Sequence, residues 1–222
     1  MAGRFRCTGT LERTLRAEGY RCVAGADEAG RGALFGPLFA AAVILSPDRP
    51  VRGLRDSKVL TAAQREELAG DIERRAVAFA VGASDANEID RVNVLQASRL
   101  AIRRALGKLA VPCDFLVADA LTIDWPVPQQ SVIHGDAKVQ AIAAASILAK
   151  VARDRCLDAW DREFPQYGLA RHKGYATADH LEALAAHGPT ALHRLTYEPV
   201  RAAYRFSRSE PEQLALALTA AL

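Results

Sequence analysis

Several features that would place the chain in a membrane or in an oxidising compartment are missing from the sequence. No apolar run reaches the length that crosses a membrane, and the arginine-rich residues 1–20 lack the apolar core of a signal peptide. The four cysteines form no Cys-x-x-Cys pair and no zinc-finger spacing. We therefore expect a cytoplasmic protein with reduced cysteines and no membrane partner.

Aromatic residues are scarce, and neither sign of charge dominates. Only 6% of the 222 residues are aromatic whereas 50% are hydrophobic, so alanine, leucine and valine must fill a sizeable core. The formal net charge of +3 permits nucleic-acid binding without requiring it. Because internal repeats and low-complexity linkers are also missing, the length fits one domain with at most a small appendage.

The acidic pair Asp27–Glu28 is the element around which the chain is organised. It follows a short, mostly apolar run at residues 21–26 that is typical of a strand. Two adjacent carboxylates at the end of a buried strand repel each other and lose hydration, and a hard cation such as Mg²⁺ or Mn²⁺ relieves both penalties. The alternative is a polar β-turn that caps a hairpin. The apolar stretch that follows, residues 33–45, favours the metal site.

Two glycines and an arginine follow the acidic pair. Gly30 and Gly32 give the backbone the freedom to end or distort the strand near Glu28, and they leave amide groups bare. Arg31 adds a forked, permanently charged donor. Residues 30–32 are therefore a candidate contact for a sugar or a phosphate.

Hydrophobic periodicity predicts an α/β fold with a mixed sheet flanked by helices. Strand patterns are found at residues 21–26, 38–45, 77–83, 115–118 and 131–134, and helix patterns at residues 10–17, 61–75, 85–109, 138–163 and 177–187. The second strand is expected to pair antiparallel with the first, and Thr61 with Gln64 predicts a capping box. The helix at 85–109 is expected to bury one face, formed by Ile89, Val92, Leu95, Ile102, Leu106 and Leu109.

Two further acids follow predicted strands. Asp119 comes directly after residues 115–118, and functional residues of open α/β sheets gather at such carboxyl ends. An ordinary strand-end turn is the alternative for Asp119. Asp136 precedes the long helix, where its residue type also suits a helix N-cap. The residues alone leave these alternatives open.

An ordered set of motifs resembles the ribonuclease HII family over residues 22–200. The set starts with residues 27–32, which are similar to that family's Asp-Glu-x-Gly-Arg-Gly signature. The later matches follow in the family's order and are Asp56-Ser57-Lys58, Asp119, Gly135-Asp136, residues 143–151, Arg153-Asp154, residues 173–177 and Gly188-Pro189-Thr190. Each motif is weak alone, but the ordered set is highly specific. Ala29 and Ala120 depart from the family's usual valine and glycine, and neither change removes a ligand.

The resemblance implies a ribonuclease H-like fold with a helical C-terminal part. Residues 1–20 would be an extension, residues 21–204 the catalytic domain and residues 205–222 a helical tail. The implied reaction uses two Mg²⁺ or Mn²⁺ ions to cut the RNA strand of RNA–DNA hybrids. It also cuts duplex DNA 5′ of a single ribonucleotide and leaves a 3′-hydroxyl and a 5′-phosphate. The implied role is ribonucleotide removal from DNA by a monomer.

The family's metal ligands transfer onto matching acids of this chain. Asp27, Glu28 and Asp119 are the implied ligands, with Asp136 nearest the attacking water or the second metal. Four carboxylates offset the repulsion between two divalent ions. Asp154 lies between two arginines and is a possible fifth acid, with local ion pairing as the favoured alternative.

The implied nucleic-acid contacts lie outside the acids. The backbone of Gly30–Gly32 would read a 2′-hydroxyl, the group that separates RNA from DNA. Ser57 and Lys58 would follow the nucleic-acid groove, and Tyr175 would pack on the sugar after the ribonucleotide; a solvated lysine and a buried tyrosine are the alternatives. His172 is expected either to touch a phosphate or to lie in a solvated basic loop. The remaining histidines lack metal-ligand spacing and are interpreted as surface or core residues.

Two rival functions remain open at this point. A nucleotide-binding phosphotransferase would use the glycines at 30, 32 and 36, but their spacing misses both the dinucleotide fingerprint and the P-loop. Tight ATP binding would support that rival. A non-catalytic nucleic-acid-binding module would instead show metal-independent binding without cleavage.

Overall fold

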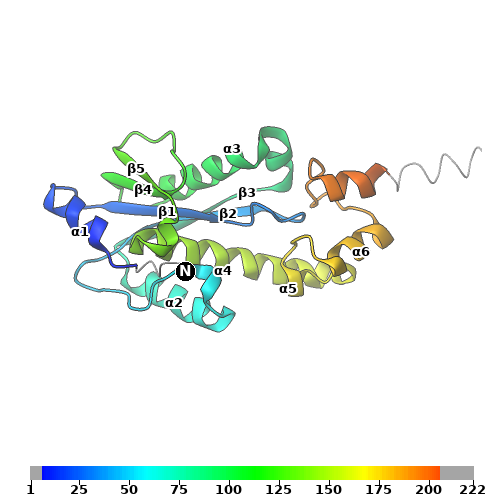
Figure 1. Cartoon of the computed structure of the whole chain (residues 1–222), viewed down its shortest axis with the longest axis horizontal. Coiled ribbons are helices and arrows are strands. Elements are labelled where there is room, and N and C mark those ends of the chain that lie inside the picture. The colour runs from blue at the N-terminus through cyan, green and yellow to red at the C-terminus, as the bar shows by residue number, and fades with distance from the viewer. Residues whose placement is uncertain (1–6, 206–222) are drawn as a thin grey trace, which may run out of the picture. The chain divides into compact units, whose positions relative to one another are not determined.

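A computed structural model describes residues 7–205, in which five strands form one mixed sheet (Figure 1). The strands lie in the order β3-β2-β1-β4-β5 and are β1 Val23–Ala29, β2 Leu38–Ile44, β3 Ala78–Ser84, β4 Phe115–Asp119 and β5 Gln129–Val132. Strand β2 pairs antiparallel with both β1 and β3, whereas β4 pairs parallel with β1 and β5. The predicted α/β class and the antiparallel β1–β2 pair are confirmed.

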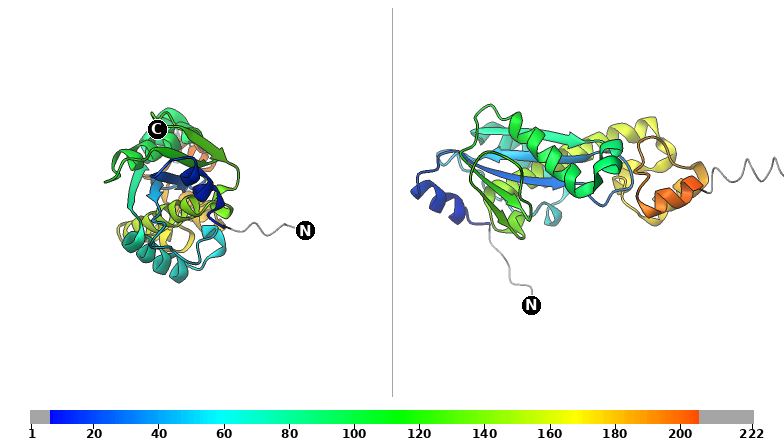
Figure 2. Two further views of the ribbon diagram at one scale, coloured as in Figure 1. Left: turned by 90° about the vertical axis from the view of Figure 1, so that its left-hand side faces the viewer. Right: turned by 90° about the horizontal axis from the view of Figure 1, so that it is seen from above.

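Helices α1–α6, three short 3₁₀-helices and a further helical segment at residues 198–205 complete the described residues (Figure 2). The α-helices are α1 Thr10–Ala17, α2 Ala62–Arg75, α3 Ala86–Gly107, α4 Gln140–Glu163, α5 Leu169–His172 and α6 Ala178–His187, and the 3₁₀-helices are η1 Ser57–Val59, η2 Gly135–Ala137 and η3 Pro165–Tyr167. The predicted capping box is present, because Thr61 Oγ1 accepts from Gln64 N and Gln64 Oε1 accepts from Thr61 N. Within residues 7–205, no helix is long and apolar enough to span a membrane.

The predicted buried face of α3 is wrong in its first half. Ile89, Ile102 and Leu106 are buried, but Val92 and Leu95 are exposed. The reason is Asn93, whose φ of 68° and ψ of 163° interrupt the helix. Val92 and Leu95 flank this break, so the regular buried face assumed from the sequence is interrupted around it. Asparagine tolerates positive φ better than most residues do, and hydrophobic periodicity carries no signal of it.

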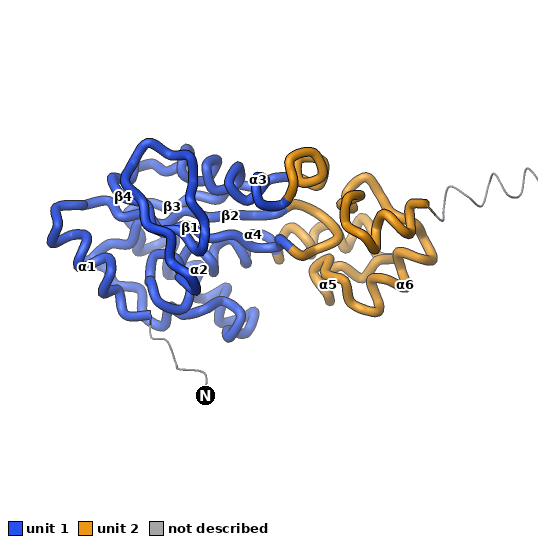
Figure 3. The backbone as a smooth tube through the Cα atoms, turned by 45° about the horizontal axis from the view of Figure 1, so that its top comes forward, with its two compact units in different colours: residues 1–31, 38–84, 94–153 blue, residues 32–37, 85–93, 154–222 orange. Residues whose placement is uncertain are grey.

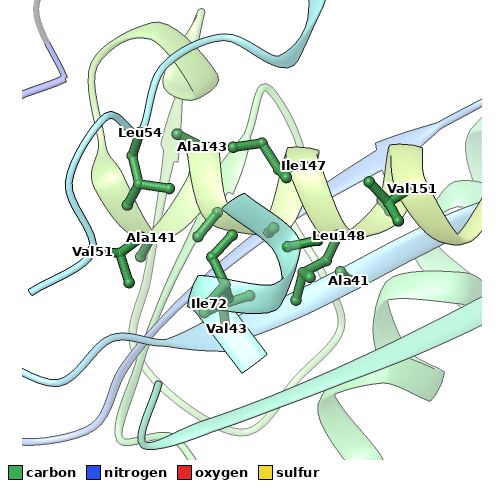
Figure 4. Close-up of a cluster of buried hydrophobic side chains, with 14 of the residues drawn as sticks. Ala41, Val43, Val51, Leu54, Ile72, Ala141, Ala143, Ile147, Leu148 and Val151 are labelled. Atoms are coloured by element: carbon green, nitrogen blue, oxygen red, sulfur yellow. The ribbon is translucent and has the colours of Figure 1, made fainter. Parts of the chain in front are cut away.

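The chain divides into two compact units (Figure 3). Unit 1 contains residues up to 31, 38–84 and 94–153, and unit 2 contains residues 32–37, 85–93 and those from 154 on. In unit 1, α2 and α4 pack on one face of the sheet, where Val43 of β2, Ile72 of α2 and Ile147 of α4 share one core cluster (Figure 4). Leu15 of α1 joins a second cluster with Val23 of β1. The predicted helical tail at residues 205–222 lies outside the described residues from residue 206 on.

Unit 2 has its own small cores. One is centred on Phe35, Leu157, Tyr167 and Leu169, and another on Leu34, Leu184 and Val200. The predicted helix from Thr177 is confirmed as α6, with Thr177 Oγ1 accepting from His180 N. The segment at residues 32–37 therefore leaves the sheet and becomes part of the core of unit 2.

Candidate active site

Parallel pairing brings two of the predicted acids to one edge of the sheet. Ala26 of β1 is paired with Ala118 of β4, so Asp27 and Asp119 follow side by side on neighbouring strands. The strand β1 ends one residue after Glu28, as expected. Neighbouring parallel strands end at the same edge of a sheet, which is the usual place for a functional site in such folds.

The fourth acid reaches this edge through the loop after β5. The amide of Gly135 donates to Asp119 Oδ1 at 2.7 Å, which fixes the start of η2 beside Asp119. Asp136 is the next residue and is only 4% exposed. His134, directly before η2, has a positive φ of 57° and makes no side-chain cap. The alternative that Asp136 is an N-cap is therefore wrong, because His134 holds that position in η2 and α4 begins later, at Gln140.

Burial and like charge destabilise the ionised forms of the acidic pair. The pKa of Asp27 is raised well above its ordinary value, first by burial and then by the charges of Glu28 and Asp119. The pKa of Glu28 is also raised by burial and by Asp119, although the neighbouring Arg31 guanidinium opposes this shift. The Arg31 Nη1 atom lies 3.2 Å from Glu28 Oε1. One positive side chain therefore offsets only part of the negative charge that is concentrated here.

One carboxylate oxygen in this group lacks a partner. Glu28 Oε2 is buried and accepts no hydrogen bond among the described residues. An unpaired buried oxygen on a charged group is costly, and a divalent cation with oxygen ligands would satisfy it. The donor set therefore fits a hard metal ion. As placed, the described residues include no group of three or more acid, histidine or cysteine side chains close enough to hold an ion, so the metal ligands stay a prediction.

Lys58 faces the acids from the loop before α2. Its Nζ atom donates to Asp136 Oδ2 at 3.1 Å. Partial burial lowers the pKa of Lys58, but the hydrogen bond to Asp136 and the charges of Asp136, Asp56 and Asp27 outweigh that effect and raise it. The lysine is thus a permanent countercharge at the site. This contact between residues far apart in sequence was not predicted, since Lys58 was expected only to contact nucleic acid.

Replacing Asp136 separates a catalytic role from a structural one. We expect Asp136→Ser to lower cleavage by more than about tenfold, because losses around a metal site cost about 10- to 100-fold. The melting temperature should fall by only a few degrees, because an ion pair with an exposed lysine contributes about 0–1 kcal/mol. Both quantities are measured on one preparation.

Lys58→Met is the matched control for that variant. It removes the same ion pair but keeps the carboxylate of Asp136. We expect the same small change in melting temperature and a smaller loss of cleavage than in Asp136→Ser. Equal losses of cleavage in both variants would assign the effect to the ion pair and would contradict a metal or water role for Asp136.

Ser146 is a site residue that the sequence interpretation missed. Its hydroxyl lies 3.0 Å from Ser57 Oγ, and its hydrogen bond to Asp27 lowers the pKa of that carboxyl against the stronger effect of burial. The signal was present, because Ser146 is the only polar residue between Ala141 and Ala149. Ser57 itself is buried, and its hydroxyl already has a hydrogen-bond partner in Ser146. Its predicted contact with nucleic acid stays a prediction.

The glycines after the acids differ from each other. Gly30 has a φ of +95°, and a Cβ atom there would lie 2.0 Å from Nε of the buried Arg153. Gly32 has no positive φ, and a Cβ atom there would meet nothing within 4 Å among the described residues. The prediction that both glycines provide conformational freedom is therefore confirmed for Gly30 and wrong for Gly32, whose backbone is simply uncovered.

Gly32 and Tyr175 are tied together within unit 2. Ala33, next to Gly32, forms an antiparallel bridge with Tyr175, and Leu34 N donates to Gly174 O at 2.8 Å. Tyr175 is 36% exposed, which excludes the alternative of a buried tyrosine. The remaining predicted site residues, from Asp27 to Arg31 and at 57, 58, 119 and 136, belong to unit 1.

The structure contradicts both expectations for His172 and does not test the role of Asp154. His172 is buried, its Nε2 atom lies 2.7 Å from Tyr167 O, and its Nδ1 atom accepts from Gly174 N. Both expectations for His172, a phosphate contact and a solvated loop, are therefore wrong. Asp154 is the first residue of the last segment of unit 2, and its role stays a prediction.

Solved structures identify the fold. Ribonuclease H2 from Pyrococcus horikoshii matches with a TM-score of 0.73 and 25% identity, covering 85% of this chain and 99% of that chain. Bst-RNase HIII in complex with Mn²⁺ matches with a TM-score of 0.67 and 18% identity, covering 85% and 70%, which supports the fold alone. A ribonuclease H-like sheet with acids at the ends of β1 and β4 defines a nuclease of the ribonuclease H class.

Sequence comparison narrows this class to one family. A family model for ribonuclease HII matches residues 24–200. Ribonuclease HII of Solibacter usitatus is 57% identical over 218 residues, 98% of this chain and 96% of that protein. Ribonuclease HII of Syntrophotalea carbinolica is 50% identical over 192 residues, 86% and 92% of the two chains. The chain belongs to the ribonuclease HII family and is an endoribonuclease.

Proposed function

We propose that this endoribonuclease cuts the RNA strand of RNA–DNA hybrids and also cuts duplex DNA on the 5′ side of a single embedded ribonucleotide. The products would be a 3′-hydroxyl and a 5′-phosphate, and the role would be ribonucleotide removal from DNA in the cytoplasm. The observation that carries the proposal is the set of acids at the ends of β1 and β4, with a buried Glu28 oxygen that lacks a partner among the described residues.

Two divalent cations, Mg²⁺ or Mn²⁺, complete the proposed site. When bound, such ions lower the pKa of an attacking water and neutralise charge on the phosphate and the leaving oxygen. Asp27, Glu28 and Asp119 are the proposed ligands. The raised pKa values of Asp27 and Glu28, together with the repulsion between the acids, supply the affinity for positive charge. The Mn²⁺ complex of Bst-RNase HIII, a protein of the same fold, is consistent with this choice of ions.

The residues around the acids have separate proposed roles. Ser146 and the amide of Glu28 both hydrogen-bond to Asp27, so they hold its orientation. Asp136 would accept a proton from the attacking water or hold the second ion. Lys58 neutralises Asp136 without substrate, and its exposed position allows it to turn to a phosphate of the nucleic acid. The backbone at Gly32 is open to a ribose.

A pair of glycine variants tests the proposed backbone reader. We expect Gly32→Val to change the free energy of unfolding by no more than about 0.5 kcal/mol, because the added side chain meets open space. Its melting temperature should therefore stay close to that of the wild type. Cleavage should nevertheless fall on every ribose-containing substrate, because the new side chain blocks the approach of the sugar. Thermal melting and cleavage rates are measured together.

Gly30→Ala is the contrasting variant. It should destabilise the fold itself, because its Cβ atom meets the buried Arg153 and its φ is positive. If Gly32→Val keeps wild-type cleavage on all substrates, the backbone at Gly32 does not contact the ribose. That result would leave the role of the acids untouched.

One assay tests the proposed function directly. The protein is incubated with a DNA duplex that contains one ribonucleotide, with Mg²⁺, with Mn²⁺ and with EDTA. We expect a single cut on the 5′ side of the ribonucleotide with either metal, no cut in EDTA and no cut of an all-DNA duplex. Cleavage of RNA–DNA hybrids with no cut at the single ribonucleotide would restrict the enzyme to hybrids.

A further inference from the structure

Two histidines lie completely inside unit 2, directly behind the segment that presents Tyr175. His180 is 0% exposed and His193 is 1% exposed. Their Nε2 atoms face each other at 3.4 Å. The reaction proposed above uses neither residue. The buried contact between these two imidazole rings lies outside the acidic site, so it needs a role of its own.

The partners of the two rings determine where each proton lies. His180 Nδ1 lies 3.0 Å from Tyr175 O, and a carbonyl only accepts, so this nitrogen carries the proton. The Nε2 atom of a neutral His180 must then accept. His193 Nδ1 accepts from Thr190 N at 3.0 Å, so its proton lies on Nε2. The pair therefore forms a directed chain of hydrogen bonds from Thr190 through His193 and His180 to Tyr175.

Both rings must be neutral for this chain to exist. A second proton would place two N–H groups against each other at the His180–His193 contact. Burial lowers the pKa of His193 to about 3, and the charge of His180 acts in the same direction. Burial also lowers the pKa of His180, where the charge of His172 adds to the effect and the hydrogen bonds to the backbone of Tyr175 and Gly174 oppose it. His172, stacked on His180 at 4.4 Å between ring centroids, has its own partners in Tyr167 and Gly174. The pair of His180 and His193 is therefore neutral at physiological pH.

The backbone that this network supports is unfavourable on its own. Lys173 and Gly174 have φ values of 50° and 75°, so two successive residues before Tyr175 are left-handed. Glycine adopts a positive φ readily, but Lys173 is strained there, and such strain persists only where the surroundings fix it. The carbonyl of Tyr175 accepts from Thr177 N at 2.8 Å and from His180, and Gly174 O accepts from Leu34 N. The histidine pair supplies the one side-chain contact among these that reaches Tyr175 from the interior.

We propose that His180, held by His193, is a positioning residue that fixes the backbone of Tyr175 and thereby sets the preference for a ribose followed by a deoxyribose. This inference rests on the proposed function, in which Tyr175 packs on the sugar after the ribonucleotide. The ring of Tyr175 is exposed and its backbone bridges to Ala33, next to the backbone at Gly32. A shift of the Tyr175 carbonyl would therefore change the spacing between the two proposed sugar contacts.

The proton positions are tested first, without any substrate. Long-range ¹H–¹⁵N spectra of the wild-type protein at pH 7 report the tautomer of each histidine ring, and His180→Asn and His193→Asn assign the signals. We expect the Nδ1–H form for His180 and the Nε2–H form for His193. An Nε2–H form of His180, or a charged ring at either position, would overturn the chain of hydrogen bonds.

Two substitutions of His180 then separate positioning from mere support. His180→Asn places an amide N–H near the Nδ1 position, so the bond to Tyr175 O can be kept and the bond to His193 is lost. His180→Gln places its amide near the Nε2 position, so the bond to His193 can be kept and the bond to Tyr175 is lost. Both variants should melt below the wild type, and only His180→Gln should lower the ratio of cleavage rates on the single-ribonucleotide duplex and on a long RNA–DNA hybrid. The expected decrease is about fivefold or more, the lower limit for a lost stacking contact.

A double variant shows whether His180 acts through Tyr175. The ratio for Tyr175→Ala with His180→Gln should equal the ratio for Tyr175→Ala alone. Equal ratios for His180→Asn and His180→Gln would overturn the positioning role, because they would show only a general loss of support. An unchanged ratio in Tyr175→Ala would remove the proposed role of Tyr175 and the positioning role with it, while the tautomer spectra would still decide whether the chain of hydrogen bonds exists.

Discussion

Asp27→Asn is expected to melt at a higher temperature than the wild type in EDTA and to lose cleavage by more than about 100-fold. The loss should exceed the cost of about 10- to 100-fold that follows changes around a metal's direct ligands. The amide of asparagine keeps the oxygen that accepts from Glu28 N at 2.8 Å, so the backbone contact survives. The variant therefore removes only the negative charge of Asp27. The loss of that charge is expected to cause both the higher melting temperature in EDTA and the loss of cleavage.

The sign of the stability change follows from the pKa of Asp27. Burial and the neighbouring acids raise that pKa well above the ordinary value of 3.8, so the folded state binds more protons than the unfolded state between the two values. The metal-free wild type is therefore most stable at low pH in this window and loses stability as the pH rises through the folded pKa. At pH 7.5 the asparagine variant avoids that loss, and each kcal/mol regained raises the melting temperature by about 2–4 °C.

Metal addition provides the control for this prediction. Mg²⁺ or Mn²⁺ should raise the melting temperature of the wild type, because an ion that binds only the folded state stabilises it. Asp27→Asn should lose most of that increase, and Asp119→Asn should lose both the increase and cleavage. Full cleavage by either variant, or wild-type cleavage in EDTA, would show that these carboxylates do not hold a catalytic metal.

The acidic edge was predictable because its signals are local. Apolar runs before Asp27 and Asp119 indicate strands, and strands that enter one sheet in parallel deliver their ends to one edge. The contact between Lys58 and Asp136 joins residues 78 positions apart, and no local pattern encodes it. Asp136 illustrates the difference, because its residue type fits an N-cap equally well and only the position of η2 excludes that interpretation.

The histidine pair shows why burial is harder to predict than chemistry. His180 and His193 are 13 positions apart, which matches no ligand spacing, and histidine is neither reliably buried nor reliably exposed. Their contact depends on the bridge between Phe35 and His193, which brings the segment after Gly32 against the loop that follows α6. That pairing is set by tertiary structure, so the sequence supplied the residues of the network without its connections.

Tyr175→Ala is expected to reduce cleavage of the single-ribonucleotide duplex about 5- to 150-fold more than cleavage of a long RNA–DNA hybrid. The range corresponds to the loss of a stacking contact worth ~1–3 kcal/mol. At the junction, the tyrosine ring would pack on a deoxyribose, whereas a second 2′-hydroxyl in a continuous hybrid crowds the ring. The contact therefore contributes mainly to the junction substrate. Initial rates on both substrates are measured at the same metal concentration.

The backbone of Tyr175 is held by hydrogen bonds that do not involve its ring. The side chain of Tyr175 is exposed, and the hydrogen bonds that fix its backbone come from Thr177, His180 and His172, so truncation of the ring leaves them in place. Tyr175→Phe keeps the ring and should keep the wild-type ratio of rates, which separates packing from any contribution of the hydroxyl. If Tyr175→Ala cuts both substrates with the wild-type ratio, the tyrosine does not sense the junction. The nuclease activity would then still depend on the carboxylates at the ends of β1 and β4, because those side chains belong to the other unit and do not require this ring.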